Sequence, residues 1–551
     1  MSTFLNWIKV LAAAGTLALS STQATWADRI PIPVPSPSAT KLRGPVVEPA
    51  TPIARAIRDV LPALIDPGLK RVYQARGYAP FWLTKDGATE QAFFVLEAFS
   101  AANDHALNPD NYGPLEFIDR ARAAQNAEDW ASIEVDLSIQ FLRYAAHVSS
   151  GRVQPNKINK ALNIFPDRPK AKDLFHALET TSNFSAFLDS LPPQTASYLR
   201  LQIRLGEYRE KAANGGFTSI PKGEVLKPEM IDPRVPTLKE RLVQEDFLLA
   251  EQHSGSTYNG ALVEAVKNFQ SYYGLEVDGI IGKSTLEALN VSINDRLIQM
   301  ELNMERRRWM PDNLGDTYVF VNLADQALKV VRNGKTWHTT PVIVGKPYHA
   351  TPVFSDVMTY VEVNPYWNVP YSISTREYLP KLQANANALS GKNMRVFLNG
   401  KEVASSNVNW SAYSRRNFPF QLRQDPGPDN ALGRIKFMFP NEFNIYIHDT
   451  PTKSLFNRAQ RDFSHGCIRV AKPFDLGDVL LSPEGYSKGK LEKIRDSQKR
   501  TVIKLNKPLK VHLTYLTAWM NKDGSTHFRR DIYSRDAVLL KALREAMVKN
   551  L

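Results

Sequence analysis

The chain has 551 residues, more than one hydrophobic core usually organises, so its length predicts about three or four domains. Hydrophobic residues make up 43% of the sequence and charged residues 23%, a composition that excludes a chain disordered throughout. The 69 Lys and Arg residues outnumber the 56 Asp and Glu residues and give a net charge of +13, which favours an anionic partner. A solvated basic surface is the alternative interpretation of that charge.

Residues 1–27 have the pattern of a secretory signal peptide. Lys9 precedes an apolar run over residues 10–19, and small residues follow around Ala24 and Ala27. The run is too short to span a bilayer comfortably, and no other stretch has the apolar length of a membrane-spanning helix. We expect an exported chain with no transmembrane span after signal cleavage, and an uncleaved anchor is the alternative. For such a chain, acidic cell-wall polymer or a membrane surface is a better anionic partner than nucleic acid.

Residues 28–52 are rich in proline and predict an extended linker. Residues 53–235 follow with apolar positions at helical spacing, as in IARAIRDVLPALI and VDLSIQFLRYAAHV. This pattern predicts a helical domain. The sequence of that domain contains no cluster of nucleophile, base or metal ligands.

Residues 236–295 predict a second, smaller helical module. Gly274 ends its first helix, and Ser284 is placed to cap a helix over residues 285–289. The run Gly282-Lys283-Ser284 is not a phosphate-binding loop, because Val277 stands where that motif requires a glycine. The apolar face of the first helix consists of Leu262, Val266, Phe269 and Tyr273.

The segment AVKNFQSYYGLEVDGIIGKSTLEAL within this module resembles the small helical peptidoglycan-binding module, whose pattern is AVxxFQxxxGLxxDGxxGxxTxxAL. The match covers about thirty residues. An ordinary helical hairpin, in which Asp278 and the glycines serve only the turn, is the alternative.

Residues 296–315 predict a connecting helix, and residues 316–551 predict a mostly β domain. Alternation is clear in TYVFVNLADQALKVV, and a hairpin is expected around Lys522-Asp523-Gly524. Between residues 375 and 430 the strands give way to a polar region that is too long for a simple connection. A capping lid is the natural hypothesis, with a passive surface insertion as the alternative.

Cys467 is the only cysteine in the chain, so it forms no internal disulfide and is either a buried apolar filler or a working thiol. A thiol becomes nucleophilic when a nearby base or positive charge stabilises its thiolate. Two histidines are candidate bases: His465, two residues away, and His448, at the end of NEFNIYIHDT. From the sequence, either could pair with the thiol.

The residues around Cys467 fit acyl transfer. Gly466 allows a tight turn and leaves its own N–H and that of Cys467 free to bind one oxyanion. Arg469 is suited to bidentate binding of a carboxylate, and an ion pair with Asp475 is the alternative.

The run from HDT to SHGCIRV resembles the signature of the L,D-transpeptidase catalytic domain, the YkuD-type β fold. Further runs, NPYWNVPYSI, DPGPDNALGRIKFMFPN and LTYLTAW, are similar to the large periplasmic members of that family. Those members also carry a helical scaffold domain, a peptidoglycan-binding module and a capping insertion. The resemblance therefore covers nearly the whole mature chain and implies a multi-domain α+β fold.

The resemblance implies a periplasmic enzyme that cross-links peptidoglycan. Cys467 would attack the diaminopimelate carbonyl of a tetrapeptide stem, release D-alanine and form a thioester. His448 would be the base, Ser464 and His465 would shape the loop, and Gly466 with Cys467 would form the oxyanion site. An amine of a neighbouring stem would then resolve the thioester.

The substrate would contact Arg469, Tyr446, Trp367 and Tyr371, although core packing is an alternative for Trp367. The route requires no cofactor or metal, and its partners are stem peptides, glycan and other cell-wall enzymes. We expect a depressed pKa for the Cys467 thiol and covalent capture by carbapenems. The same site would act as a carboxypeptidase with water as acceptor, or attach a protein to the wall. A non-catalytic wall-binding scaffold is the competing class, and a papain-type peptidase lacks the expected residues around the cysteine.

Overall fold

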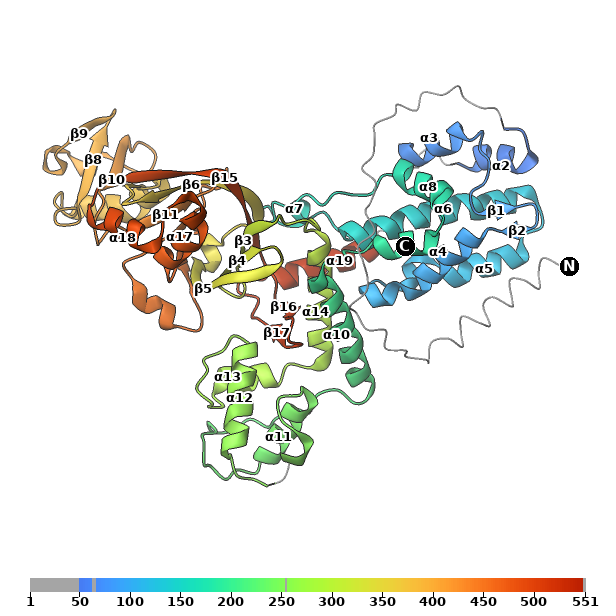
Figure 1. Cartoon of the computed structure of the whole chain (residues 1–551), viewed down its shortest axis with the longest axis horizontal. Helices are drawn as coiled ribbons and strands as arrows, with labels where there is room; N and C mark the ends of the chain where they lie inside the picture. The colour runs from blue at the N-terminus through green and yellow to red at the C-terminus, as the bar shows by residue number, and fades with distance from the viewer. Residues whose placement is uncertain (1–48, 62–65, 253–254, 549–551) are drawn as a thin grey trace. The chain divides into compact units, whose positions relative to one another are not determined.

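The computed structural model describes residues 49–61, 66–252 and 255–548. The expected signal peptide and most of the expected linker lie outside these residues. Contacts divide the chain into two compact units, one comprising residues up to 152 with 167–194, the other residues 153–166 with 195–549 (Figure 1). Helical domains accompany a large mixed β-sheet, so the predicted multi-domain α+β fold class is confirmed. No helix within the described residues combines the length and apolar character needed to cross a membrane.

The first unit is helical, as predicted, with one short hairpin. Side-chain N-caps begin several of its helices, for example Thr51 before α2 and Asn126 before α6. Gly151 ends α6 with φ +87°. The elements are α2 (Pro52–Val60), α3 (Pro67–Ala75), β1 (Leu83–Thr84), β2 (Gly87–Ala88), α4 (Glu90–Ser100), α5 (Pro114–Ala123), α6 (Ala127–Ser150), α8 (Ala171–Thr180) and α9 (Phe184–Ser190).

A buried carboxylate organises the aromatic core of this unit. The Glu134 carboxylate accepts hydrogen bonds from the Phe81 N–H at 2.6 Å, the Trp82 N–H at 3.0 Å and the Tyr73 hydroxyl at 2.8 Å. Burial raises the pKa of Glu134 to about 7, while these hydrogen bonds act in the opposite direction.

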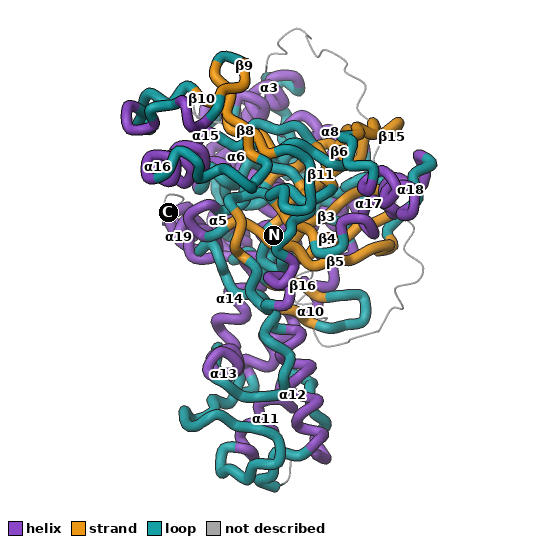
Figure 2. The backbone as a smooth tube through the Cα atoms, turned by 90° about the vertical axis from the view of Figure 1, so that its left-hand side faces the viewer, coloured by secondary structure: helices purple, strands orange, loops and turns teal. Residues whose placement is uncertain are grey.

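The second unit begins with short α7 (Pro155–Ile158) and continues with helices α10 to α14. Figure 2 shows α10 and α14 side by side, and contacts between them confirm this arrangement. The predicted apolar face of the module helix is buried, and Gly274 follows that helix with φ +64°. The bounds are α10 (Ala196–Ala213), α11 (Val235–Gln244), α12 (Gly260–Tyr272), α13 (Lys283–Leu289) and α14 (Ile293–Arg308).

The expectation that Ser284 caps the second module helix is wrong. α13 begins two residues earlier than predicted, at Lys283, with Gly282 at the N-cap position and Ser284 inside the first turn. The preceding turn is held by Gln270, which donates to the Asp278 carboxylate at 2.8 Å and accepts from the Gly279 N–H at 2.8 Å. Because Gln270 of α12 holds this turn, α13 begins without a side-chain cap.

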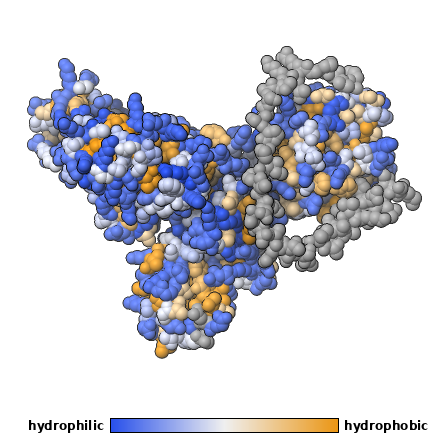
Figure 3. All heavy atoms as spheres, in the orientation of Figure 1, coloured by the Kyte–Doolittle hydropathy of each residue, from blue (hydrophilic) through white to orange (hydrophobic). Residues whose placement is uncertain are grey.

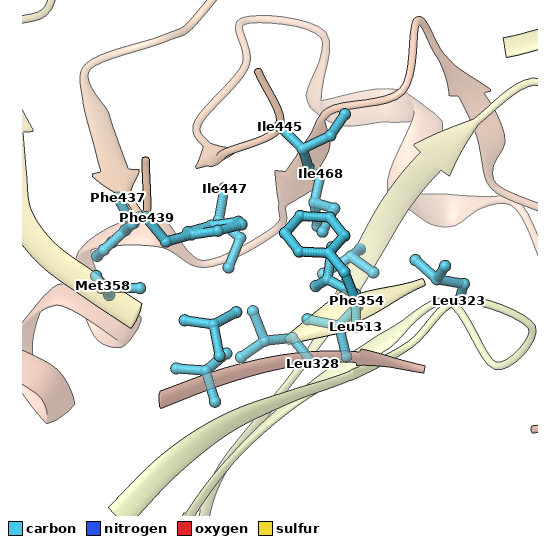
Figure 4. Close-up of a cluster of buried hydrophobic side chains, with 14 of the residues drawn as sticks. Leu323, Leu328, Phe354, Met358, Phe437, Phe439, Ile445, Ile447, Ile468 and Leu513 are labelled. Atoms are coloured by element: carbon cyan, nitrogen blue, oxygen red, sulfur yellow. The ribbon is translucent and has the colours of Figure 1, made fainter. Parts of the chain in front are cut away.

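The β part of the second unit is built on a nine-stranded sheet with the order β13-β5-β14-β12-β11-β6-β15-β3-β4. β5 also pairs with β4, so the sheet closes on itself around one hydrophobic core (Figure 4). Closure leaves few free edges and encloses the inward-facing residues of each strand. The strands are β3 (Thr317–Asn322), β4 (Ala327–Arg332), β5 (Lys335–Gly345), β6 (Phe354–Val363), β11 (Ile435–Met438), β12 (Ile447–His448), β13 (Asp462–Ser464), β14 (Ile468–Val470) and β15 (Thr501–Thr514).

Three helices and a hairpin complete this part of the unit. The predicted hairpin is confirmed, because Ala518 pairs with Phe528 and Met520 with Thr526 around the turn. The elements are α17 (Pro473–Leu481), α18 (Lys488–Asp496), β16 (Ala518–Met520), β17 (Thr526–Phe528) and α19 (Arg535–Val548).

The region predicted to lack strands instead folds around its own four-stranded sheet, in the order β7-β10-β8-β9. A separate hydrophobic core runs from Trp367 to Leu432, so this capping insertion begins before and ends after the expected range 375–430. Its strands are only a few residues long and are separated by polar loops, which hides their alternation in the sequence. The elements are β7 (Trp367–Asn368), α15 (Tyr371–Ile373), the π-helix η6 (Ser374–Tyr378), α16 (Leu379–Ala384), β8 (Met394–Leu398), β9 (Lys401–Val403) and β10 (Phe420–Gln424).

Candidate active site

Parallel strands β12 and β14 bring the two halves of the motif together. Ile447 pairs with Ile468, and His448 pairs with Arg469. Ile447, Ile468 and Val470 are buried in the core, so His448 and Arg469 project from the opposite face. Cys467, one residue before β14, continues this alternation onto the same face, diagonal to His448 and within reach of a long side chain.

The loop before Cys467 is held by its own hydrogen bonds. The Ser464 hydroxyl donates to the Cys467 carbonyl at 2.6 Å and accepts from the Gly466 N–H at 3.1 Å. The Thr351 hydroxyl donates to the Gly466 carbonyl at 2.7 Å, and Gly466 has φ +117°. The expectation that the Gly466 N–H is free for an oxyanion is therefore wrong for this arrangement, since Ser464 occupies it.

Cys467 is half-buried, and its Sγ lies 3.7 Å from the Asn444 carbonyl, to which the thiol donates. Burial raises the pKa of the Cys467 thiol, whereas hydrogen bonds from Tyr446 and the positive charges of Lys436 and Arg469 lower it in part. The expected depressed pKa is wrong because burial outweighs the stabilising groups. With its pKa raised, Cys467 is a neutral thiol at neutral pH.

His448 is buried, with 4% of its surface exposed, and its Nδ1 lies 2.5 Å from the Asp449 carbonyl. A second hydrogen bond joins the ring to the backbone of Leu432. Burial, followed by the nearby charge of Arg469, lowers the pKa of His448 to about 3. The imidazole is therefore neutral at physiological pH. With Nδ1–H donated to a carbonyl, Nε2 is the nitrogen able to accept a proton.

Asp449 supports the histidine from the next position in the chain. Its carboxylate accepts hydrogen bonds from the Arg434 N–H at 2.8 Å and the Thr450 N–H at 2.7 Å, and pairs with Lys453 at 2.5 Å. Gly433 packs directly against it: a Cβ at Gly433 would lie 2.4 Å from the carboxyl carbon. Gly433 also has φ +63°, a conformation that glycine adopts readily.

Lys436 is a site residue that the sequence analysis missed. Lys436 in β11 lies directly opposite His448 in the neighbouring strand β12. Its Nζ lies 4.2 Å from the centre of the Tyr446 ring. Burial lowers the pKa of Lys436, and the nearby Glu362 and Cys467 oppose that change. The alternation in IKFM, with a lysine between two core residues, is the signal that would have placed Lys436 on the same face as His448.

Tyr446, expected to contact the substrate, lies against the thiol. Burial and the neighbouring Cys467 raise the pKa of its phenol well above the usual value, so the hydroxyl stays protonated and donates to sulfur.

Arg469 does not form the ion pair with Asp475 that was the alternative to carboxylate binding. Asp475 pairs instead with Lys488 at 2.6 Å. Burial lowers the pKa of Arg469, while Cys467 raises it. Among the described residues, the buried Nε of Arg469 has no hydrogen-bond partner. The guanidinium retains a donor beside the thiol.

His465, the other candidate base, faces the capping insertion. Its Nε2 lies 2.6 Å from Oε1 of Glu377 in η6, and its ring lies 5.1 Å from that of His349. Because the contact with Glu377 occupies Nε2 of His465, His448 is the better candidate for the base.

Trp367 and Tyr371 lie in the capping insertion with different exposures. Trp367 is 8% exposed and belongs to the core of the insertion, which favours the packing interpretation. Tyr371 is 52% exposed and donates through its hydroxyl to the Arg415 carbonyl at 2.7 Å. Tyr371 is therefore the more exposed of the two rings, although it also contacts Phe418 edge-on. No group of three or more potential metal ligands occurs among the residues covered by the structure.

Comparison with known proteins gives three family matches within the chain. Residues 316–482 match the L,D-transpeptidase catalytic domain, residues 232–289 match the "Putative peptidoglycan binding domain", and residues 67–205 match the scaffold domain. A "Putative L,D-transpeptidase" of Haemophilus influenzae is 34% identical over 239 residues. That match covers 43% of this chain and 48% of the relative, so the chain spans about half the relative's length.

Solved L,D-transpeptidases are more distant. One from Stackebrandtia nassauensis is 14% identical, with a TM-score of 0.21, and the match covers 54% of this chain and 96% of that one. One from Xylanimonas cellulosilytica is 17% identical, with a TM-score of 0.17, and the match covers 53% and 98%. Scores this low support no statement about the geometry of the site. The family matches establish that the chain carries an L,D-transpeptidase catalytic domain together with a peptidoglycan-binding domain and a scaffold domain.

Proposed function

We propose that the chain is a cysteine-dependent L,D-transpeptidase that joins diaminopimelate residues of neighbouring peptidoglycan stems in the periplasm. The observation that carries the proposal is the placement of a neutral thiol, a neutral buried imidazole and two cations on one face of β11, β12 and β14. The family matches supply the reaction class, and the peptidoglycan-binding domain supplies the substrate class.

In the first step, Sγ of Cys467 bonds to the carbonyl carbon of diaminopimelate in a tetrapeptide stem, and its proton passes to Nε2 of His448. The thiol first turns from the Asn444 carbonyl toward the imidazole. Because thiol and imidazole are both neutral at rest, this is general-base catalysis and not attack by a preformed thiolate. The bond to D-alanine then breaks, and its nitrogen takes the proton from His448.

In the second step, the amine of a neighbouring stem attacks the thioester and restores the thiol. The positive charges of Lys436 and Arg469 stabilise the negative charge that develops in the transition state. They also attract the carboxylates of the stem peptide. The Cys467 N–H is the first candidate oxyanion donor, and the Gly466 N–H becomes a second only if it leaves Ser464.

The test is intact-protein mass spectrometry of the mature chain with a carbapenem and, separately, with a disaccharide tetrapeptide. An adduct on the parent chain, absent from a folded Cys467→Ala variant, is expected. Product analysis then separates the acceptors, since cross-linked dimer indicates an amine and free tripeptide indicates water, while a protein conjugate indicates wall attachment. A folded chain that forms no adduct with either reagent would favour the wall-binding scaffold.

A further inference from the structure

A second candidate site lies within the second unit, away from Cys467. It is a cavity of about 290 Å³ between α10, the segment after α11, α12 and the β16–β17 turn. Figure 1 shows β16 and β17 near α10 and α14, and contacts join α10 to β16 and α12 to β17. The walls thus come from both the peptidoglycan-binding region and the C-terminal hairpin.

Aromatic rings form one side of this cavity. Phe247 and Tyr272 are partly exposed, and their ring centres are 5.3 Å apart. Arg529 holds the backbone of Tyr272, because it donates to the Tyr272 carbonyl at 2.6 Å and to the Asp325 carboxylate at 2.7 Å. The Tyr272 ring itself packs against the His527 ring, with the centres 4.7 Å apart. Fixed aromatic faces beside polar groups suit ligands that have both apolar C–H faces and hydroxyl groups.

The cavity also contains unused hydrogen-bonding capacity. Within the part of the chain that the structure describes, Nε of Arg204 and Oγ1 of Thr526 are buried without a hydrogen-bond partner. Asn268 adds an exposed side-chain amide at the rim. These groups can donate and accept, which matches hydroxyl and N-acetyl groups.

Most charges lining the cavity are matched by neighbours, and Asp523 is a lining carboxylate held by hydrogen bonds from Ser525. Glu245 pairs with Arg241 at 2.8 Å, and Asp246 pairs with Lys211 at 2.9 Å. Arg204 pairs with Glu207 at 2.7 Å. Because the paired charges cancel and the Asp523 carboxylate repels anions, a neutral ligand fits better than an anionic stem peptide.

Figure 3 shows hydrophilic residues over much of the displayed face, with scattered hydrophobic patches among them. We propose that this cavity binds one amino-sugar residue of the peptidoglycan glycan strand. The sugar ring packs on Tyr272 and Phe247, and its hydroxyl and N-acetyl groups bond to Arg204, Thr526 and Asn268. This inference rests on the proposed function for its substrate class, and it assigns the glycan to a site shared by the binding region and the hairpin.

The test measures binding of short glycan strands, freed of stem peptides by amidase digestion, to the mature chain by calorimetry. Thr526→Val with Asn268→Ala is expected to weaken binding about tenfold, because two bonds to the sugar are lost. Ser271→Ala, on the same helix but outside the cavity, is the matched control. Asn268→Ala alone changes only an exposed side chain, so it keeps the test valid if the double variant fails to fold.

Each outcome bears on one proposal. Glycan affinity equal in parent and variants, or no glycan binding by the parent, would overturn the cavity assignment. Carbapenem acylation of Cys467 is measured on the same samples and should not change with these substitutions. Acylation without glycan binding would therefore contradict only the sugar-binding proposal. Glycan binding without acylation would contradict only the transpeptidase proposal.

Discussion

Glu377 of the capping insertion lies 2.6 Å from Nε2 of His465, which is two residues from Cys467. The pair joins η6 to the catalytic loop, so the position of the insertion and the shape of the loop are linked. In the proposed reaction a thioester would be exposed to hydrolysis, and a cover over the loop would protect it until an amine arrives. The pair is therefore a candidate latch for the capping insertion.

Replacing Glu377 with Gln removes the charge and keeps the shape. Because the pair is partly exposed and such pairs contribute about 0.2–1 kcal/mol, we expect the ratio of hydrolysed to cross-linked product to rise by up to about fivefold. Quantifying tripeptide and dimer products by mass spectrometry measures this ratio. Glu402→Gln, which changes an exposed pair elsewhere in the insertion, is the control. An unchanged product ratio in both variants would show that the Glu377–His465 pair does not act as a latch.

The pH dependence of Cys467 alkylation distinguishes a neutral thiol from a preformed thiolate. Burial raises the thiol pKa above its ordinary value, so the alkylation rate with iodoacetamide should still be rising through pH 9 (the reference value is about 8.5). A preformed thiolate–imidazolium pair would instead give a rate already constant near neutral pH. Rates measured by mass spectrometry between acidic and alkaline pH decide between these profiles.

His448 affects both rate and acid stability. His448→Gln should slow acylation by roughly 10²–10⁴-fold, the usual contribution of a general base. Because the folded pKa of about 3 lies below the unfolded value of about 6.5, the unfolded chain binds the proton first as the pH falls. The contribution of His448 to the free energy of unfolding is therefore complete above about pH 6.5 and is lost as the pH falls toward about 3. Denaturant unfolding of parent and variant at several pH values measures this loss, which the variant should lack.

The sequence predicted the helical and β regions from local periodicity, and a compact motif with its family resemblance proposed Cys467 and His448 for the site. It could not place Lys436, whose proximity to Cys467 depends on the pairing of β11 with β12. It also missed the sheet of the capping insertion, because strands of a few residues give little alternation. The raised thiol pKa depends on burial by distant segments, which no local pattern records.

Lys436→Met tests whether that lysine acts on the thiol. The substitution keeps a long apolar side chain against Tyr446 and removes the charge that lowers the Cys467 pKa. We expect the alkylation profile of Cys467 to move to higher pH and acylation to slow about tenfold. Lys401→Met, at an exposed position in β9, is the control. A slower reaction with an unmoved pH profile would assign Lys436 a packing role only.

Gly433 tests how closely Asp449 must be held. Gly433→Ala places a Cβ 2.4–2.5 Å from the Asp449 carboxyl group and forces φ +63° on a residue that disfavours it. Gly400→Ala is the matched control, since Gly400 has φ +79° with nothing within 4 Å of its Cβ position. The control should lose only about 1–2 kcal/mol of unfolding free energy from the left-handed conformation. Gly433→Ala should lose more and also slow acylation, because Asp449 must shift and carries the carbonyl that holds Nδ1 of His448. Equal losses of stability with unchanged acylation in both variants would show that the carboxylate moves freely and does not position the histidine.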